Sequence, residues 1–295
     1  MLFLEWLKAI LYGIVEGITE WLPISSTGHL ILIEDFLPFA FTTDKVFLDE
    51  FSEMFQVVIQ LGAILAVVVL FWGKLWPFSA KKSSYEKKNT WMLWLKVVIA
   101  SVPAALIGIV GDKILEKASG KDIDGWLYNS IVVAIALIVY GVAFIVIERI
   151  HRGTAARVES IEEISLGKAL AIGAFQSLSI VPGTSRSGST ILGSMLLGLS
   201  RTAGAEFSFF MAIPAMVGAS GIKILGFLNY LSESGAAVPA EAWITLAIGC
   251  IVSFAVSMAA IRFLMDFVKK HSFAAFGVYR IVLGAVVLLL WLIRR

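Results

Sequence analysis

Long runs of apolar residues account for most of the chain. Six of them come close to the roughly 20 residues that a helix needs to cross a membrane. They cover about 52–72, 91–111, 126–147, 204–225, 242–262 and 273–293. The pattern predicts six transmembrane helices joined by short connections.

Two further apolar regions are interrupted by polar residues. Region 2–37 contains Glu16, Glu20 and Pro23, followed by the run Ser25-Ser26-Thr27-Gly28-His29. Region 166–200 contains Pro182, Gly183 and the polar run 185–190. Irregular backbone at membrane depth is tolerated only where it is buried in protein or lines a wet cavity. We therefore predict that each region is a re-entrant hairpin, with two short helices joined by a polar turn.

Composition supports a polytopic membrane protein. Hydrophobic residues make up 59% of the 295 residues and charged residues 16%, whereas a soluble domain is nearer half apolar and a quarter charged. The length fits a single integral membrane domain spanning 1–295. Its basic residues cluster in short loops, which is typical of membrane topology and argues against nucleic-acid binding. The lone Cys250 excludes an internal disulfide.

Lysines and arginines are unevenly distributed among the connections. Connections 73–90, 148–168 and 263–272 are rich in them, whereas 226–241 has none. The positive-inside rule places the first three in the cytoplasm and the last outside. Connection 112–125 has mixed charge, and alternation puts it and both termini outside. Arg294 and Arg295 weigh against that placement.

The two halves of the chain are weakly alike. The segment Gly13–Glu16 aligns with Gly173–Gln176. At the same offset, Ser25, Ser26 and Gly28 align with Ser185, Arg186 and Gly188, and further on Phe51-Ser52 and Gly62-Ala63 align with Phe207-Ser208 and Gly218-Ala219. Each half contains one hairpin and three spans, and three is odd, so the second half is inverted relative to the first. We expect repeats at about 1–150 and 160–295, with hairpin tips meeting near the midplane.

The first polar segment carries acids, hydroxyls and an imidazole. Glu16 and Glu20 lie one helical turn apart, and a divalent cation such as Mg²⁺ or Ca²⁺ would suit their oxygens; the alternative is a solvated pair near a helix end. Pro23 ends the helix, so a second helix beginning near Ser25 and Ser26 would direct N–H groups at an anion. A hydroxyl beside His29 could serve as nucleophile and base, although a lone histidine is more often structural.

Arg186 dominates the second polar segment. Its planar guanidinium suits two-point binding of phosphate. Hydroxyls surround it, and Gly183 and Gly188 would let backbone approach a ligand. The alternative is a cytoplasmic loop. Gln56 and Gln60 could line the cavity or bond between helices, and Arg280 could snorkel to the surface or pair inward.

These motifs resemble the undecaprenyl-diphosphate phosphatase family, the bacitracin-resistance proteins. The resemblance covers nearly the whole chain and rests on EGITEWLPISSTGHL, VVIQLGAILAVVV, PGTSRSGST and SRTAGAEFSFFMA. It implies an all-α polytopic membrane enzyme of the bacterial cytoplasmic membrane, with inverted repeats and two re-entrant hairpins, that removes the terminal phosphate of undecaprenyl diphosphate outside the membrane. That reaction recycles the lipid carrier for peptidoglycan and lowers the target of bacitracin.

The resemblance also assigns residues. Expected catalytic residues are Glu16, Glu20, Ser25, Ser26, His29 and Arg186, with Glu16 and Glu20 also expected as metal ligands. Expected substrate-binding residues are Thr27, Thr184, Ser185, Ser187, Thr190, Gln56 and Gln60. Gln56 departs from the family, which often has an acid there, and this weakens a metal or acid–base role at that position. The nucleophile is left open among Ser26, Ser25, His29 and an activated water.

Two other functions compete with the phosphatase. A lipid-phosphate transporter would need the same broken helices and anion pocket. The acid-phosphatase-like lipid phosphatases share a similar Ser–Gly–His segment, but this chain lacks their Lys-x6-Arg-Pro signature and has no histidine soon after Arg186. Expected partners are a polyprenyl diphosphate and the bilayer, and the sequence fits either a monomer or a homodimer.

Overall fold

The computed structural model describes residues 2–120, 123–127 and 129–293, and within these ranges it contains helices and no strands. The α-helices are α1 (Leu2–Thr19), α2 (Ser26–Phe36), α3 (Lys45–Leu70), α4 (Trp72–Leu75), α5 (Ser84–Leu106), α6 (Asp112–Ser119), α7 (Ile123–Leu127), α8 (Ser130–Ile150), α9 (Leu166–Gln176), α10 (Arg186–Leu196), α11 (Arg201–Ser234), α12 (Ala240–Lys270) and α13 (Ala274–Ile293). Short turns η1 (Ile107–Gly111), η2 (Ile161–Glu163) and η3 (Ser177–Ile180) complete the described elements.

Six of the described helices are long and apolar enough to cross a membrane, as predicted. Four of them, α3, α5, α11 and α12, begin before the predicted apolar windows, because backbone hydrogen bonding does not require apolar side chains. The third helix starts at Lys45 after the cap Asp44, and the capping box of Ser83 and Glu86 starts α5 within a connection that the sequence treated as a loop. At its C-terminal end α5 continues through the π-helical η1 into α6. Helix therefore replaces most of the predicted connection 112–125.

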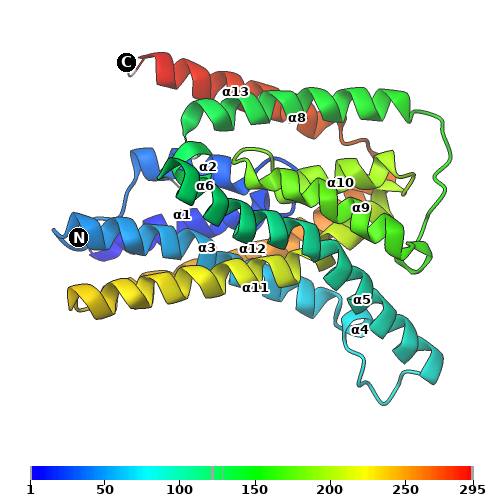
Figure 1. The fold of residues 1–295 in the computed structure, drawn as a ribbon, viewed down its shortest axis with the longest axis horizontal. Coiled ribbons are helices and arrows are strands. Elements are labelled where there is room, and N and C mark those ends of the chain that lie inside the picture. The colour runs from blue at the N-terminus through cyan, green and yellow to red at the C-terminus, as the bar shows by residue number, and fades with distance from the viewer. Residues whose placement is uncertain (1, 121–122, 128, 294–295) are drawn as a thin grey trace.

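The long helices lie roughly parallel (Figure 1). The first and last described residues lie at one end of the bundle, while the connections α4–α5 and α8–α9 lie at the other (Figure 1). With the helix ends beside them, these two segments, 73–90 and 148–168, carry nine of the chain's 24 lysines and arginines. The basic connections therefore gather at the end opposite the termini, as the charge pattern predicts.

Close contacts between backbones hold the bundle together. A Cβ on Gly62 of α3 would collide with the carbonyl oxygen of Cys250 in α12, and one on Gly173 of α9 would collide with that of Ala100 in α5. Small residues allow such approach, which is how helices pack where lipid offers no hydrophobic driving force. Large apolar side chains, including Phe3 and Ile251, remain exposed on the outside, where lipid would cover them.

Both polar regions are helices separated by an irregular break. The first break separates α1 from α2 at residues 20–25, and the second separates η3 from α10 at residues 181–185. Each ends at a serine with positive φ, Ser25 at 75° and Ser185 at 71°, and these are the only non-glycine residues in the described chain with that conformation. Each serine side chain accepts a hydrogen bond from the backbone N–H three residues on and so caps the next helix.

Candidate active site

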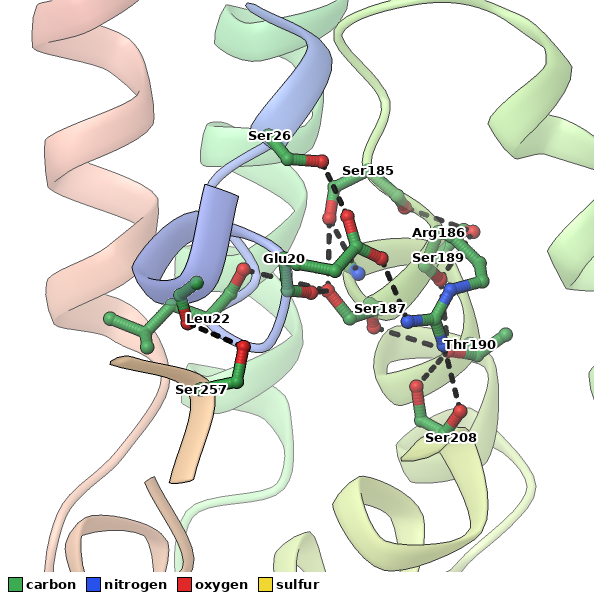
Figure 2. A network of polar contacts seen from close by, with 12 residues as sticks. Glu20, Leu22, Ser26, Ser185, Arg186, Ser187, Ser189, Thr190, Ser208 and Ser257 are labelled. Carbon is green, nitrogen blue, oxygen red and sulfur yellow. Dashed lines mark hydrogen bonds and ion pairs between the residues drawn. The ribbon is translucent and has the colours of Figure 1, made fainter. Parts of the chain in front are cut away.

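An ion pair joins the two breaks. Arg186 NH2 donates to Glu20 Oε1 at 2.9 Å, although the two residues are far apart in sequence (Figure 2). Both side chains are almost fully buried, with 7% of Glu20 and 11% of Arg186 exposed. A buried charge needs a partner, so each break depends on the other for its electrostatic balance.

The second oxygen of Glu20 accepts a hydrogen bond from a serine. Ser26 Oγ lies 2.5 Å from Glu20 Oε2 (Figure 2), and Ser26 is 7% exposed. A carboxylate in that position can accept the hydroxyl proton as the oxygen attacks an electrophile. Ser25 Oγ instead accepts from the N–H of Gly28 as a helix cap. Of the two adjacent serines, Ser26 is therefore the one whose hydroxyl donates to a carboxylate.

The remaining contacts of Arg186 fix its guanidinium. Its NH1 donates to the backbone oxygen of Ser208 in α11 at 2.7 Å, and the guanidinium lies 5.8 Å from the ring centre of Trp21. Trp21 is itself fully buried and packs edge-on against Phe209. The two terminal nitrogens of the guanidinium therefore donate to different partners, the Ser208 carbonyl and the Glu20 carboxylate. Arg186 Nε is buried without a hydrogen-bond partner in the described chain.

Hydroxyl groups support both breaks. Ser187 Oγ donates to the backbone oxygen of Glu20 at 3.1 Å and lies 3.1 Å from Ser185 Oγ. The hydroxyl of Thr190 donates to the backbone oxygen of Arg186 at 2.9 Å and lies 2.7 Å from Ser208 Oγ. Thr184 is buried in the second break. Ser187 and Thr190, two of the predicted substrate-binding residues, thus contact the backbone of Glu20 and of Arg186.

Two helices begin at this cluster. Ser26 and Arg186 are the first residues of α2 and α10. The positive end of each helix dipole and its free N–H groups favour an anion nearby. Together with the Arg186 guanidinium, these groups are suited to bind a phosphate. Such a phosphate would compete with Glu20 for the guanidinium.

Glu16 lies in the last turn of α1, one turn before Glu20, the first residue of the break. Its side chain is fully buried, and neither carboxylate oxygen has a hydrogen-bond partner within the described residues. Both Glu20 and Arg186 act on it electrostatically. Two free hard oxygens beside a second carboxylate fit a divalent cation, although the described residues contain no cluster of three or more metal-ligating side chains.

Other predicted residues make contacts outside the Glu20–Arg186 cluster. His29 Nδ1 lies 2.7 Å from the backbone oxygen of Ser25, and its Nε2 lies 2.7 Å from the hydroxyl of Tyr279 in α13. Gln56 donates to Glu34 of α2 at 2.7 Å. The side chains of Thr27 and Gln60 are partly exposed, on α2 and α3. A separate cavity of about 420 Å³ lies where α10 ends and α11 begins, and it is lined by His151, Arg157 and Lys269 among others.

Several residues at or near the site escaped the sequence analysis. Trp21 and Ser208 both contact Arg186, and Glu34 and Tyr279 bind predicted residues. Trp21 is adjacent to Glu20 and Ser208 lies within a motif already singled out, so their positions offered a signal. Arg280, whose direction the sequence left open, points inward and is fully buried.

The chain has close relatives among known proteins. Residues 9–286 match the family described as bacitracin resistance protein BacA. A protein of Enterococcus faecalis is 50% identical over 292 residues, covering 99% of both chains, and one of Acetivibrio thermocellus is 51% identical over 292 residues, covering 99% of this chain and all of its own. One of Streptococcus gordonii is 49% identical over 294 residues, covering all of this chain and 98% of its own. Each of the three is named undecaprenyl-diphosphatase. The chain belongs to the BacA family of bacitracin resistance proteins.

Proposed function

We propose that the protein is an undecaprenyl-diphosphatase, which converts undecaprenyl diphosphate to undecaprenyl phosphate and inorganic phosphate. The names of relatives about 50% identical over the full chain support this activity. The observation that carries it is the buried cluster of Ser26, Glu20 and Arg186, in which a hydroxyl, a carboxylate and a guanidinium meet. The reaction regenerates the lipid carrier for peptidoglycan synthesis and accounts for bacitracin resistance in the family.

In the proposed mechanism, the diphosphate head enters between the two breaks while the polyprenyl tail stays in lipid. Arg186 and the starts of α2 and α10 bind the phosphates and stabilise the charge that develops during transfer. Ser26 Oγ attacks the terminal phosphorus and Glu20 takes its proton. The bond to the bridging oxygen breaks, and undecaprenyl phosphate leaves. Water then hydrolyses the phosphoserine and releases phosphate.

Two roles within this mechanism need a rearrangement or another ligand. His29 could protonate the leaving group only after its Nε2 exchanges the Tyr279 hydroxyl for substrate. The Glu16 carboxylate has free oxygens and, with Glu20, would hold Mg²⁺ or Ca²⁺. A bound cation would neutralise phosphate charge. A water activated by Glu20 is the alternative nucleophile, and a trapped phosphoenzyme would distinguish the two.

We also propose the inverted repeat and the two re-entrant hairpins. The breaks support the repeat, because Ser25 and Ser185 share a positive φ and the same capping bond. Helix packing supports it too: α1 packs on α12 as α9 packs on α5, and α3 packs on α12 as α11 packs on α5. In Figure 1, α1 starts at the end of the bundle where the termini lie, and α2 returns toward that end. This course supports hairpins that leave the membrane on the side from which they entered.

The proposed location is the bacterial cytoplasmic membrane, with the active site open to the outside. Basic connections at the end opposite the termini support this orientation under the positive-inside rule. The substrate partner is a polyprenyl diphosphate lipid. A homodimer remains a prediction, as does the absence of nucleic-acid binding.

Phosphate release by purified protein in detergent tests this function. No membrane separates two compartments in that assay, so an enzyme releases phosphate from a polyprenyl diphosphate and a transporter does not. Wild type is compared with Glu20→Gln, which removes the carboxylate that binds both Ser26 and Arg186. No release from wild type over a titration of Mg²⁺ and Ca²⁺ would overturn the proposal and favour transport.

A further inference from the structure

Arg280 is a fully buried arginine in the second turn of α13. Its NH1 donates to the backbone oxygen of Pro23 at 3.0 Å, and its NH2 donates to those of Gly183 and Thr184 at 2.7 and 2.8 Å. In the described chain no carboxylate forms an ion pair with it. The ring of Tyr140, 5.6 Å from the guanidinium carbon, adds a cation–π contact.

The three acceptors belong to both breaks. Pro23 lies two residues before Ser25, and Gly183 and Thr184 immediately precede Ser185. A non-glycine residue with positive φ is strained and persists only where its surroundings enforce it. Carbonyl groups in a buried break also lack helical donors. One guanidinium therefore satisfies carbonyl groups beside both strained serines.

We infer that Arg280 is a positioning residue, whose guanidinium ties the two breaks together and sets the distance between Ser26 and Arg186. This inference rests on the proposed function, in which those two residues act on one phosphate. Arg280 donates its hydrogen bonds to protein carbonyl groups and does not contact the substrate. Lysine cannot replace it, because one ammonium group on a flexible stem does not reproduce a planar fork that reaches both breaks.

The test compares Arg280→Lys with a matched control. Arg201 is also a helix arginine with a buried partner, binding Glu148 at 2.8 and 2.5 Å, and Arg201→Lys makes the same chemical change away from the breaks. For folded protein, we expect Arg280→Lys to lower kcat by up to about 100-fold, the cost of misplacing reacting groups by about 1 Å, with KM little changed. Arg201→Lys should alter thermal stability more than kcat.

Hydrogen exchange measured by mass spectrometry gives a second readout that needs no activity. In Arg280→Lys, peptides covering residues 20–28 and those covering 181–188 should both exchange faster, whereas in Arg201→Lys both should match wild type. Faster exchange in only one break, or in neither, would overturn the inference. So would wild-type kcat in the folded variant, or a rise in KM alone, which would indicate direct substrate binding.

A glycine substitution covers the case in which Arg280→Lys does not fold. A Cβ on Gly188 would lie 3.1 Å from both Arg280 Nη1 and Ser185 Cβ, so Gly188→Ala crowds the guanidinium and the capping serine without removing either. The matched Gly28→Ala meets Val133 and Ser25 at 3.3 and 3.4 Å and does not meet Arg280. We expect Gly188→Ala to speed hydrogen exchange in both breaks and Gly28→Ala to speed it in the first break only. An effect of Gly188→Ala confined to the second break would contradict the inference.

The proposed function and the role of Arg280 can fail separately. Wild-type protein that releases no phosphate would overturn the proposed function, and the hydrogen-exchange result would still decide the role of Arg280.

Discussion

Replacing Arg186 by lysine keeps the positive charge and removes the fork. In the structure, NH2 binds Glu20 at 2.9 Å and NH1 binds the backbone oxygen of Ser208 at 2.7 Å, in different directions. A single ammonium cannot reproduce the planar, two-direction geometry of the guanidinium. The substitution therefore separates the contribution of geometry from that of charge.

The expected loss follows from the contacts. A hydrogen bond to a charged group contributes about 1.5–3 kcal/mol. Losing one such bond in the transition state would lower kcat/KM by about 10- to 150-fold, since about 1.4 kcal/mol corresponds to a factor of ten. The same loss arises whether the missing bond would hold phosphate directly or would hold Glu20 in place for Ser26.

The assay is phosphate release in detergent from a polyprenyl diphosphate, with kcat and KM measured for folded protein. Arg201→Lys is the matched control, because its bonds to Glu148 lie outside the cluster. Activity of Arg186→Lys within about threefold of wild type, well under the loss expected from one such bond, would refute the reasoning. Equal losses in both variants would point to stability rather than to the fork.

Further substitutions test individual roles. Ser26→Ala should abolish turnover and any trapped phosphoenzyme, whereas a phosphoenzyme that survives in it would assign the nucleophile elsewhere. Glu16→Gln should raise the Mg²⁺ or Ca²⁺ concentration needed for half-maximal activity, because its free oxygens are the proposed ligands; an unchanged metal titration would exclude it as a ligand. Tyr279→Phe removes the hydroxyl that contacts His29 Nε2. The loss of one neutral hydrogen bond, about 0.5–1.5 kcal/mol, should lower kcat by about 2- to 12-fold if His29 takes part. When His29→Ala is already present, adding Tyr279→Phe should then have no further effect on kcat.

Much of the fold could be predicted from the sequence because it depends on local properties. Apolar length located the six spanning helices, and the Pro–Ser–Gly runs located both breaks. Helix ends were less predictable, since a cap such as Asp44 or Ser83 can start a helix well outside the apolar stretch. The sequence also singled out Glu20, Ser26 and Arg186, because polar groups in apolar surroundings are informative at membrane depth.

The partners of those residues could not be predicted in the same way. Tyr279 meets His29 and Arg280 meets Pro23 only because α13 packs beside both breaks. Such contacts are set by tertiary packing, and no spacing in the chain encodes them. The direction of Arg280 shows the limit clearly: snorkelling and inward pairing are both compatible with its place in the sequence, and the structure shows that it points inward to carbonyl groups.

The two breaks share one geometry but carry different chemistry, and electrostatics gives a reason. Ser25 and Ser185 cap their helices alike, yet the next residue is a serine in the first break and an arginine in the second. If both breaks carried the acid of the first, buried carboxylates would face each other without a cation; if both carried the arginine, two guanidinium groups would lack a carboxylate. Leaving a buried charge unpaired costs about 3–5 kcal/mol. The charges of a cluster shared between the two breaks therefore balance when one break supplies the carboxylate and the other side supplies the guanidinium, and in the proposed mechanism this same asymmetry sets the attacking Ser26 and the phosphate-binding Arg186 on opposite sides of one site.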